Sequence, residues 1–318
     1  MNRIRIILAS GWLLLALITG GGASCARHQP LSVYLPPPTV FNQTPSTAQL
    51  AELINRTDQV SRMQSNSATV QVTTMPSLPR LSANIAMQRS QRIRIQAAIP
   101  MLPGSGLDLG SNDQKYWMKV PAMAGGQLYY APQQTNAPFP SEMLSVEPVW
   151  LIDALGLARI DLGVPHSEPI LASDGLLEIR SPAIVGGTVG QRLLRIDSKS
   201  GVIRQQILTG NDGRLRARAV ADGFEYYPEG QFALPHRVDL QLYVGGQPLE
   251  MQIDVSRWVV NQLLTDDANL FQMPDVSPDK QFDLSTTTAT PTAMFPQLPT
   301  GYVSTAAIGP NIRGVERR

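Results

Sequence analysis

The chain has 318 residues and a formal net charge of +1, with 26 Lys and Arg against 25 Asp and Glu. This length leaves room for one large domain or two small ones. The balanced charge excludes a whole-chain field that would attract nucleic acid, so nucleic acid is not expected as a partner. The 26 prolines and 25 glycines indicate many turns, and little of the chain is expected to be helical.

The only cysteine, Cys25, lies near the N-terminus. A lone cysteine excludes an internal disulfide framework and a cysteine-based metal site. Before it come Arg3 and Arg5, an apolar run from Ile6 to Thr19 and a stretch of small residues. The apolar run is shorter than the roughly 20 residues that a membrane-spanning helix needs. We therefore predict that residues 1–24 are an export signal.

The residues Gly22-Ala23-Ser24-Cys25 resemble a lipobox, in which the cysteine thiol is linked to diacylglycerol and becomes the first residue of the mature chain. Gly22 stands where Leu is usual, so cleavage by the ordinary signal peptidase near Ala23 is the alternative. Two or three acyl chains anchor a protein firmly, whereas one is marginal. Ala26 follows the cysteine in place of the Asp that marks inner-membrane retention, which favours the periplasmic face of the outer membrane.

Residues 25–45 are rich in proline, including Pro36-Pro37-Pro38, and show no period, which is typical of an extended tether. Ser46 or Thr47 then caps a predicted helix that runs to about Asn66. At the other end, residues 284–318 are rich in Ser, Thr, Ala and Pro and are predicted to be disordered. One domain is expected between them, over residues 46–283.

Within this domain apolar and polar residues alternate with a period of two, which predicts half-buried antiparallel strands. The clearest hairpin joins 238–244 to 249–255 through glycines that allow positive φ. A short helix from Val149 to Gly156 interrupts the strands. We expect one strongly curved antiparallel sheet whose apolar face is covered by helices. The other predicted strands are 68–74, 81–87, 93–97, 107–111, 114–120, 175–181, 190–197, 201–209 and 213–221.

The chain shows no pattern of catalytic or metal-binding residues. His28, His166 and His236 lack the spacing of a metal site. The sequence has no Gly-x-Ser-x-Gly elbow, phosphate-binding glycine loop or nucleophile with an identifiable base. We predict that the protein is not an enzyme and has no cofactor and no metal.

Arg214, Arg216 and Arg218 are predicted to lie on one face of a strand. They fit a solvated outer face or, alternatively, a surface that meets anionic lipid headgroups. The loop Ile99-Pro100-Met101-Leu102 is unusually apolar. It is expected either to fold back onto the core or to project as a wedge into a membrane, with Ile99, Met101 and Leu102 as the wedge residues.

Several motifs together resemble the outer-membrane lipoprotein receptors and periplasmic carriers of the LolB/LolA type. They span most of residues 47–274. The first three elements of the resemblance are a strand, an apolar loop with Met101 and Leu102 at the place of a projecting leucine, and a next strand. A Trp/Leu helix and a last hairpin complete it. These motifs are Arg92–Ile95, Pro100–Leu109, Val149–Leu157, Gly245–Asp254 and Trp258–Val260.

The resemblance implies a mainly β (α+β) fold, an incomplete and strongly curved antiparallel β-barrel with a helical lid. Its concave face would receive acyl chains, which need an apolar interior because each exposed CH₂ costs about 0.8 kcal/mol. Alternation alone does not separate such a cavity from a filled core, and core packing is the competing interpretation for each residue. The candidate cavity residues are Leu81, Ile85, Ile93, Ile95, Trp117, Trp150, Leu240, Leu242, Met251 and Ile253.

Three functions remain open from the sequence. The first is a membrane-anchored monomer that binds acyl chains of lipids or lipoproteins and accepts lipoproteins, with a periplasmic carrier protein as a partner. The second is an envelope-stress sensor or interaction lipoprotein with the same fold. The third is a structural envelope lipoprotein without a ligand.

Overall fold

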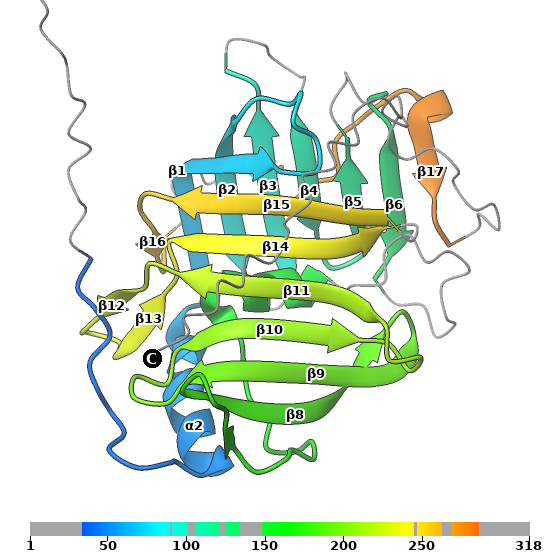
Figure 1. Ribbon diagram of the computed structural model, residues 1–318. Helices are drawn as coiled ribbons and strands as arrows, with labels where there is room; N and C mark the ends of the chain where they lie inside the picture. The colour runs from blue at the N-terminus through cyan, green and yellow to red at the C-terminus, as the bar shows by residue number, and fades with distance from the viewer. Residues whose placement is uncertain are drawn as a thin grey trace, which may run out of the picture. The chain divides into compact units, whose positions relative to one another are not determined.

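The chain divides into two units, Met1–Tyr34 and Leu35–Arg318, and every helix and strand below belongs to the second. Labels follow Figure 1. The computed structural model describes residues 34–89, 91–100, 106–120, 125–133, 148–244, 247–262 and 269–285.

Most strands form one 15-stranded sheet, and β12 (Glu225–Tyr227) pairs with β13 (Phe232–Leu234) in a separate two-stranded sheet. Neighbours are antiparallel, except that β17 runs parallel to β6. In order across the sheet the strands are β17 (Gln281–Asp283), β6 (Leu128–Pro132), β5 (Lys115–Lys119), β4 (Leu107–Ser111), β3 (Arg92–Ala98), β2 (Leu81–Gln88), β1 (Arg62–Val72), β15 (Gln247–Val255), β14 (Arg237–Val244), β11 (Leu215–Asp222), β10 (Ile203–Thr209), β9 (Thr188–Asp197), β8 (Leu176–Val185) and β7 (Ile170–Leu171), with β16 (Val259–Val260) beside β1.

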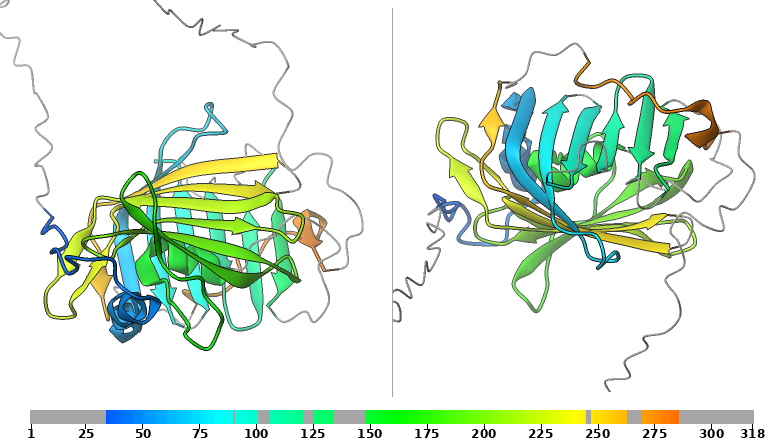
Figure 2. Two further views of the ribbon diagram at one scale, coloured as in Figure 1. Left: turned by 60° about the horizontal axis from the view of Figure 1, so that its bottom comes forward. Right: turned by 90° about the horizontal axis from the view of Figure 1, so that it is seen from above.

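The sheet is open in the described part of the chain, because its order begins at β17 and ends at β7. Figures 1 and 2 show β2 to β6 running across the direction of β8 to β11, β14 and β15. The two halves meet at β1, which pairs with β2 on one side and β15 on the other. The β1–β2 register shifts between Ser65 and Ala68, and such a bulge bends a strand and increases its twist.

Few residues in the described ranges are helical. The helical segments are α2 (Thr47–Ile54), the 3-10 turns η1 (Asn55–Gln59) and η5 (Pro278–Lys280), α3 (Pro148–Ile152) and the π-helical η4 (Asp153–Leu157). Figure 2 shows α3 and η4 between the two halves of the sheet. The short helix predicted from Val149 to Gly156 is confirmed.

Helix α2 begins where the sequence predicted and ends much earlier. The Ser46 side chain accepts from the Gln49 main-chain N–H while the Gln49 side chain accepts from Ser46, a complete capping box. The predicted continuation to Asn66 is wrong, because Arg62 already pairs with Gln88 in the sheet. Val60 and Met63 fall at spacings that suit the apolar face of a helix. In the structure they are buried by the turn and the strand that follow α2.

The predicted tether is too long. The Leu35 carbonyl accepts from the Tyr226 main-chain N–H at 2.7 Å, and the Val40 and Phe41 N–H groups donate to the Lys199 carbonyl at 2.8 and 3.0 Å. Phe41 also packs against buried side chains of the domain. Residues from Leu35 onward are therefore part of the folded unit, because their main-chain groups find partners there.

Two apolar clusters stabilise the fold. The main cluster lies between the two halves of the sheet and includes side chains of α3 and η4. The second cluster joins α2 to the inner side of β8 and β9 through Leu50, Ile54, Leu177 and Ile196, among others. Both draw on the period-two alternation that the sequence shows, since successive strand side chains point to opposite faces.

The strands predicted from the sequence are present, although β1 begins at Arg62, before its predicted start at 68, and β8 continues to Val185, past its predicted end at 181. The β14–β15 hairpin lies where it was predicted, but its strands pair up to Val244 opposite Gln247, so the second strand begins before its predicted start at 249. The strands that the sequence did not predict are β6, β7, β12, β13, β16 and β17. All of these except β6 have only two or three residues, and β6 lies next to proline-rich sequence, so each offered a weak periodic signal.

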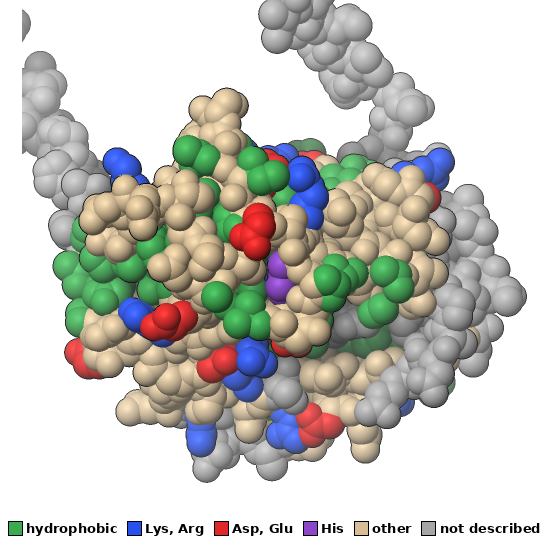
Figure 3. All heavy atoms as spheres, turned by 90° about the horizontal axis from the view of Figure 1, so that it is seen from below, with side chains coloured by type: hydrophobic (Ala, Val, Ile, Leu, Met, Phe, Trp, Pro, Cys, Tyr) green, Lys and Arg blue, Asp and Glu red, His purple; other side chains and the backbone are tan. Residues whose placement is uncertain are grey.

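Hydrophobic side chains also reach the surface. Seen from below, they form separate patches among charged groups (Figure 3). The large apolar side chains that are exposed in the described ranges are Leu35, Val40, Leu162, Ile170, Leu171, Ile184, Val189 and Phe282.

Candidate functional site

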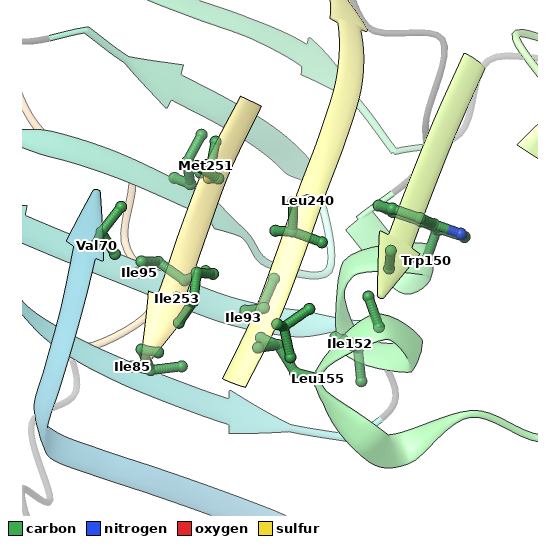
Figure 4. Packing of buried hydrophobic residues seen from close by; sticks show 14 of the residues in the cluster. Val70, Ile85, Ile93, Ile95, Trp150, Ile152, Leu155, Leu240, Met251 and Ile253 are labelled. Carbon is green, nitrogen blue, oxygen red and sulfur yellow. The ribbon is translucent and has the colours of Figure 1, made fainter. Parts of the chain in front are cut away.

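Nine of the ten candidate cavity residues meet in the main cluster. Eight are buried members of it, and Leu242 is partly buried and packs against it. Figure 4 shows Ile85, Ile93 and Ile95 on one side facing Leu240 and Ile253 on the other. None of the eight exposes more than 5% of its surface. None of them lines the pocket described below.

Trp117 is the exception, and its predicted place is wrong. Its strand neighbour Met118 belongs to the main cluster, so Trp117 points to the opposite face of the sheet. There its indole N–H donates to an Asp108 carboxylate oxygen at 3.1 Å. Gly110 lies opposite in the register, and a Cβ at this glycine would lie 2.3 Å from the indole. Trp117 is buried because the glycine leaves room for it.

The apolar loop and the anchor are only partly described. Ile99 is partly buried and packs against the main cluster, which agrees with a loop that folds back at this residue. Met101 and Leu102 lie outside the described residues, as does Cys25.

The α3–η4 segment (Pro148–Leu157) supplies the inner layer of the main cluster, with Trp150, Ile152, Leu155 and Leu157 buried. In Figure 4 the ring nitrogen of Trp150 points away from the labelled aliphatic side chains. This buried nitrogen has no hydrogen-bond partner in the described part of the chain. A buried donor without an acceptor lowers the free energy of unfolding by about 1–3 kcal/mol, so this position of Trp150 destabilises the closed segment.

Polar contacts fix the same segment to the sheet. The Asp153 carboxylate pairs with Arg192 of β9 at 2.9 Å, and both groups are largely buried. The Gln206 side-chain amide donates to the Asp153 carbonyl at 2.9 Å, and its oxygen accepts from Arg192 at 2.9 Å. Arg192 also donates to the Arg159 carbonyl at 3.3 Å. The start of η4 is therefore held by side chains from β9 and β10.

Burial raises the pKa of Asp153 to about 6, because desolvation disfavours the charged carboxylate more than Arg192, Arg89 and Arg159 favour it. Asp153 is not among the site residues predicted from the sequence. The available signal was an aspartate inside the apolar run Val149–Leu157. A lone carboxylate in such a run needs a partner.

A pocket lies beside η4, with Asp153, Ala154 and Gly156 in its lining. Its empty volume is about 690 Å³, part of it open to solvent. Its walls include the docked segment (residues 35–41) with Val40, helix α2 with Leu53, η4 with Ala154, the start of β10 with Ile203, and the β12–β13 hairpin with Phe232. Docking of residues 35–41 thus completes one wall.

Within the described ranges no group of three or more His, Cys, Asp or Glu residues is placed to hold a metal ion. No helix in those ranges is long and apolar enough to cross a membrane.

No protein-family model and no curated protein matches the chain. Solved structures of similar fold include a domain described as an outer membrane lipoprotein-sorting protein from Vibrio parahaemolyticus (8% identity, 69% of this chain and 93% of that chain, TM-score 0.46). Another is a DUF1329 family protein from Desulfovibrio piger (10%, 71% and 98%, 0.47). A third is a LolA superfamily protein from Nitrosomonas europaea (13%, 72% and 98%, 0.41).

By its fold the chain falls in the class of mainly β proteins with one large open sheet and a short helical segment against one face. Its likeness to the three solved structures stays below a TM-score of 0.5. At these TM-scores and identities, the function has to be argued from the residues of this chain.

Proposed function

We propose that the protein binds acyl chains of a lipid or a lipoprotein between the two halves of its sheet, without covalent chemistry. The observation that supports this is the single apolar cluster that fills this space. Its side chains come from both halves of the sheet and from the α3–η4 segment. In this proposal the sheet is an incomplete barrel, and the segment is its lid in the closed position.

Acyl binding then requires the α3–η4 segment to move. Trp150, Ile152 and Leu155 occupy the interior that an acyl chain would enter. An acyl chain that replaces them keeps the sheet's apolar side chains away from water. Most of the free energy gained by burying those side chains is therefore kept. The cost of opening is the loss of the segment's own contacts, including the Asp153–Arg192 pair.

The anchor and the location belong to the same proposal. A lipid on Cys25 would hold the domain at the periplasmic face of the outer membrane, where a monomer with an apolar interior could accept lipoproteins from a periplasmic carrier. Met101 and Leu102 would then act as the wedge that reaches the membrane.

Native mass spectrometry of the full chain purified from a membrane fraction tests the proposal. The mass of the mature chain reports cleavage at Cys25 and any attached lipid, and a further mass reports a bound acyl ligand. Binding of a fluorescent C16 acyl probe gives the affinity. A protein that carries no lipid and binds no probe contradicts acyl binding.

The variant Leu155→Ala tests the role of the segment. It removes fully buried packing from η4, weakens the closed state, and should tighten probe binding by about tenfold or more, since such truncations cost about 2–5 kcal/mol. Leu177→Ala, a truncation of the same size at a fully buried residue of the second cluster, is the matched control. Equal effects of the two variants would contradict the proposed opening.

The close packing of the main cluster favours one second candidate, a structural envelope lipoprotein with a filled interior. In that case Leu155→Ala lowers stability and creates no acyl binding.

A further inference from the structure

The tip of the β8–β9 hairpin carries exposed aliphatic side chains. Ile184 and Val189 lie directly opposite each other in the register and are 56% and 64% exposed. Residues 182–191 contain no Lys, Arg, Asp or Glu. Scattered apolar residues are normal on a protein surface, whereas a paired and uncharged apolar tip is typical of an interaction site.

The tip also projects beyond its neighbour. Strand β9 pairs with β10 only as far as Gln191 opposite Thr209, whereas β8 and β9 continue to pair up to Val185 opposite Thr188. Three further residue pairs extend the hairpin by roughly 10 Å along its strands. One face of this extension packs on the fold, since Val185 is buried in the main cluster, whereas Ile184 and Val189 lie on the opposite, exposed face. The turn is formed by Gly186 and Gly187, whose positive φ values of 58° and 75° allow a tight hairpin. The tip lies where β9 begins, at its right-hand end in Figure 1.

The row of residues behind the tip on the same face is apolar at its centre and cationic at its ends. The pairing places Arg180 opposite Leu193, Leu193 opposite Ile207, and Ile207 opposite Arg218. Leu193 and Ile207 are half-buried, and Arg218 is exposed.

The turn between β10 and β11 adds to this cationic rim. A Cβ on Gly190 would lie 2.2 Å from the Thr209 carbonyl oxygen, so the turn lies against the hairpin. The Arg214 side chain in this turn is 80% exposed, and Arg216 pairs with Asp212 at 2.9 Å. The rim thus contains four arginines against two acidic residues: Arg180 pairs with Glu178, Arg214 and Arg216 share Asp212, and Arg218 is the fourth.

We propose that this face, the β8–β9 tip with its arginine rim, is a second membrane-contact surface that binds an anionic lipid bilayer. Ile184 and Val189 enter the headgroup region, and Arg214 and Arg218 meet lipid phosphates. This combination of apolar and cationic groups matches a bilayer interface, where apolar burial and attraction to anionic lipid act together. The surface comes from other parts of the chain than the predicted wedge loop and does not depend on acyl binding in the interior.

Site-specific fluorescence on the full chain, reconstituted into vesicles of phosphatidylethanolamine and phosphatidylglycerol, tests the contact. Val189→Cys carries an environment-sensitive NBD label, and Gln71→Cys places the same label at an exposed position of β1. The parent chain, treated identically, corrects for label on Cys25. We expect a blue shift and quenching by acyl-chain spin labels at position 189 alone. No response at 189, or equal responses at both positions, overturns the proposal.

The arginine rim is tested in the same vesicles. Arg214→Gln and Arg218→Gln should each reduce the membrane-inserted fraction of the position-189 label by about fivefold, as should replacing phosphatidylglycerol by phosphatidylcholine. Arg237→Gln removes the same charge from an exposed arginine that pairs with Asp254 and should have little effect. If Arg237→Gln acts like the rim variants, charge acts non-specifically and the proposed contact is wrong.

Discussion

Single residues in this protein are placed by the face of the strand or helix on which they fall. Met118 joins the main cluster while its neighbour Trp117 pairs with Asp108 on the other face. The fold raises the pKa of the Asp153 carboxyl group by burying it. Its carboxylate is buried beside Arg192 of β9, whose guanidinium group only partly replaces the water that the carboxylate loses.

The raised pKa of Asp153 predicts a specific dependence of stability on pH. Its folded-state pKa of about 6 lies above the ordinary value of 3.8, so the folded protein holds this proton more tightly than the unfolded chain. The stabilisation is fully present below about pH 3.8 and is lost as the pH rises through 6. It amounts to something on the order of 3 kcal/mol.

Urea unfolding of the parent and of Asp153→Asn between pH 4 and 7.5 measures this effect. The free energy of unfolding of the parent should fall relative to the variant as the pH rises. Asp279→Asn, which removes an exposed carboxylate, should leave the curve unchanged. A constant difference between parent and Asp153→Asn would show that the carboxyl does not titrate in this range.

At the scale of elements, the α3–η4 segment depends on one glycine. Gly156 adopts a φ of 110°, which interrupts the helical conformation and turns the chain against Pro235. A positive φ is accessible to glycine at little cost. Pro235 is itself fixed, since its carbonyl accepts from the Trp258 indole N–H at 2.9 Å.

Two glycine variants separate the cost of a positive φ from the cost of the close contact with Pro235. Gly175→Ala should lower the free energy of unfolding by about 1 kcal/mol, because Gly175 has a φ of 83° and nothing within 4 Å of an added Cβ. Gly156→Ala should cost about 3 kcal/mol, because its Cβ would also lie 2.6 Å from Pro235. Denaturant unfolding compares the two, and equal losses would contradict the close contact.

In the folded unit, the main cluster and the second cluster each hold different elements together. The main cluster joins the two halves of the sheet, whereas the second fastens α2 and the docked segment to β8 and β9. The docked segment also forms one wall of the pocket. Residues 35–41 thus connect the start of the domain to the sheet.

The docked segment is testable by one substitution. Phe41→Ala should lower stability by about 1–3 kcal/mol, because Phe41 is partly buried against the second cluster. It should also speed hydrogen exchange at the Val40 and Phe41 amides, which donate to Lys199. Val40→Ala alters an exposed side chain and should change stability by less than about 0.5 kcal/mol. Unchanged exchange in Phe41→Ala would mean that the main-chain bonds alone hold the segment.

The sequence alone was enough to predict most of the longer strands, the position of the β14–β15 hairpin, the start of α2 and most of the apolar residues of the interior. These depend on local signals: a period of two, a capping box and a glycine turn. Tertiary structure decided where α2 ends, that residues 35–41 dock, and on which face Trp117 lies. It also brought Asp153 to Arg192. These outcomes depend on partners far away in the chain, whose burial and hydrogen bonds outweigh the local preference at each position.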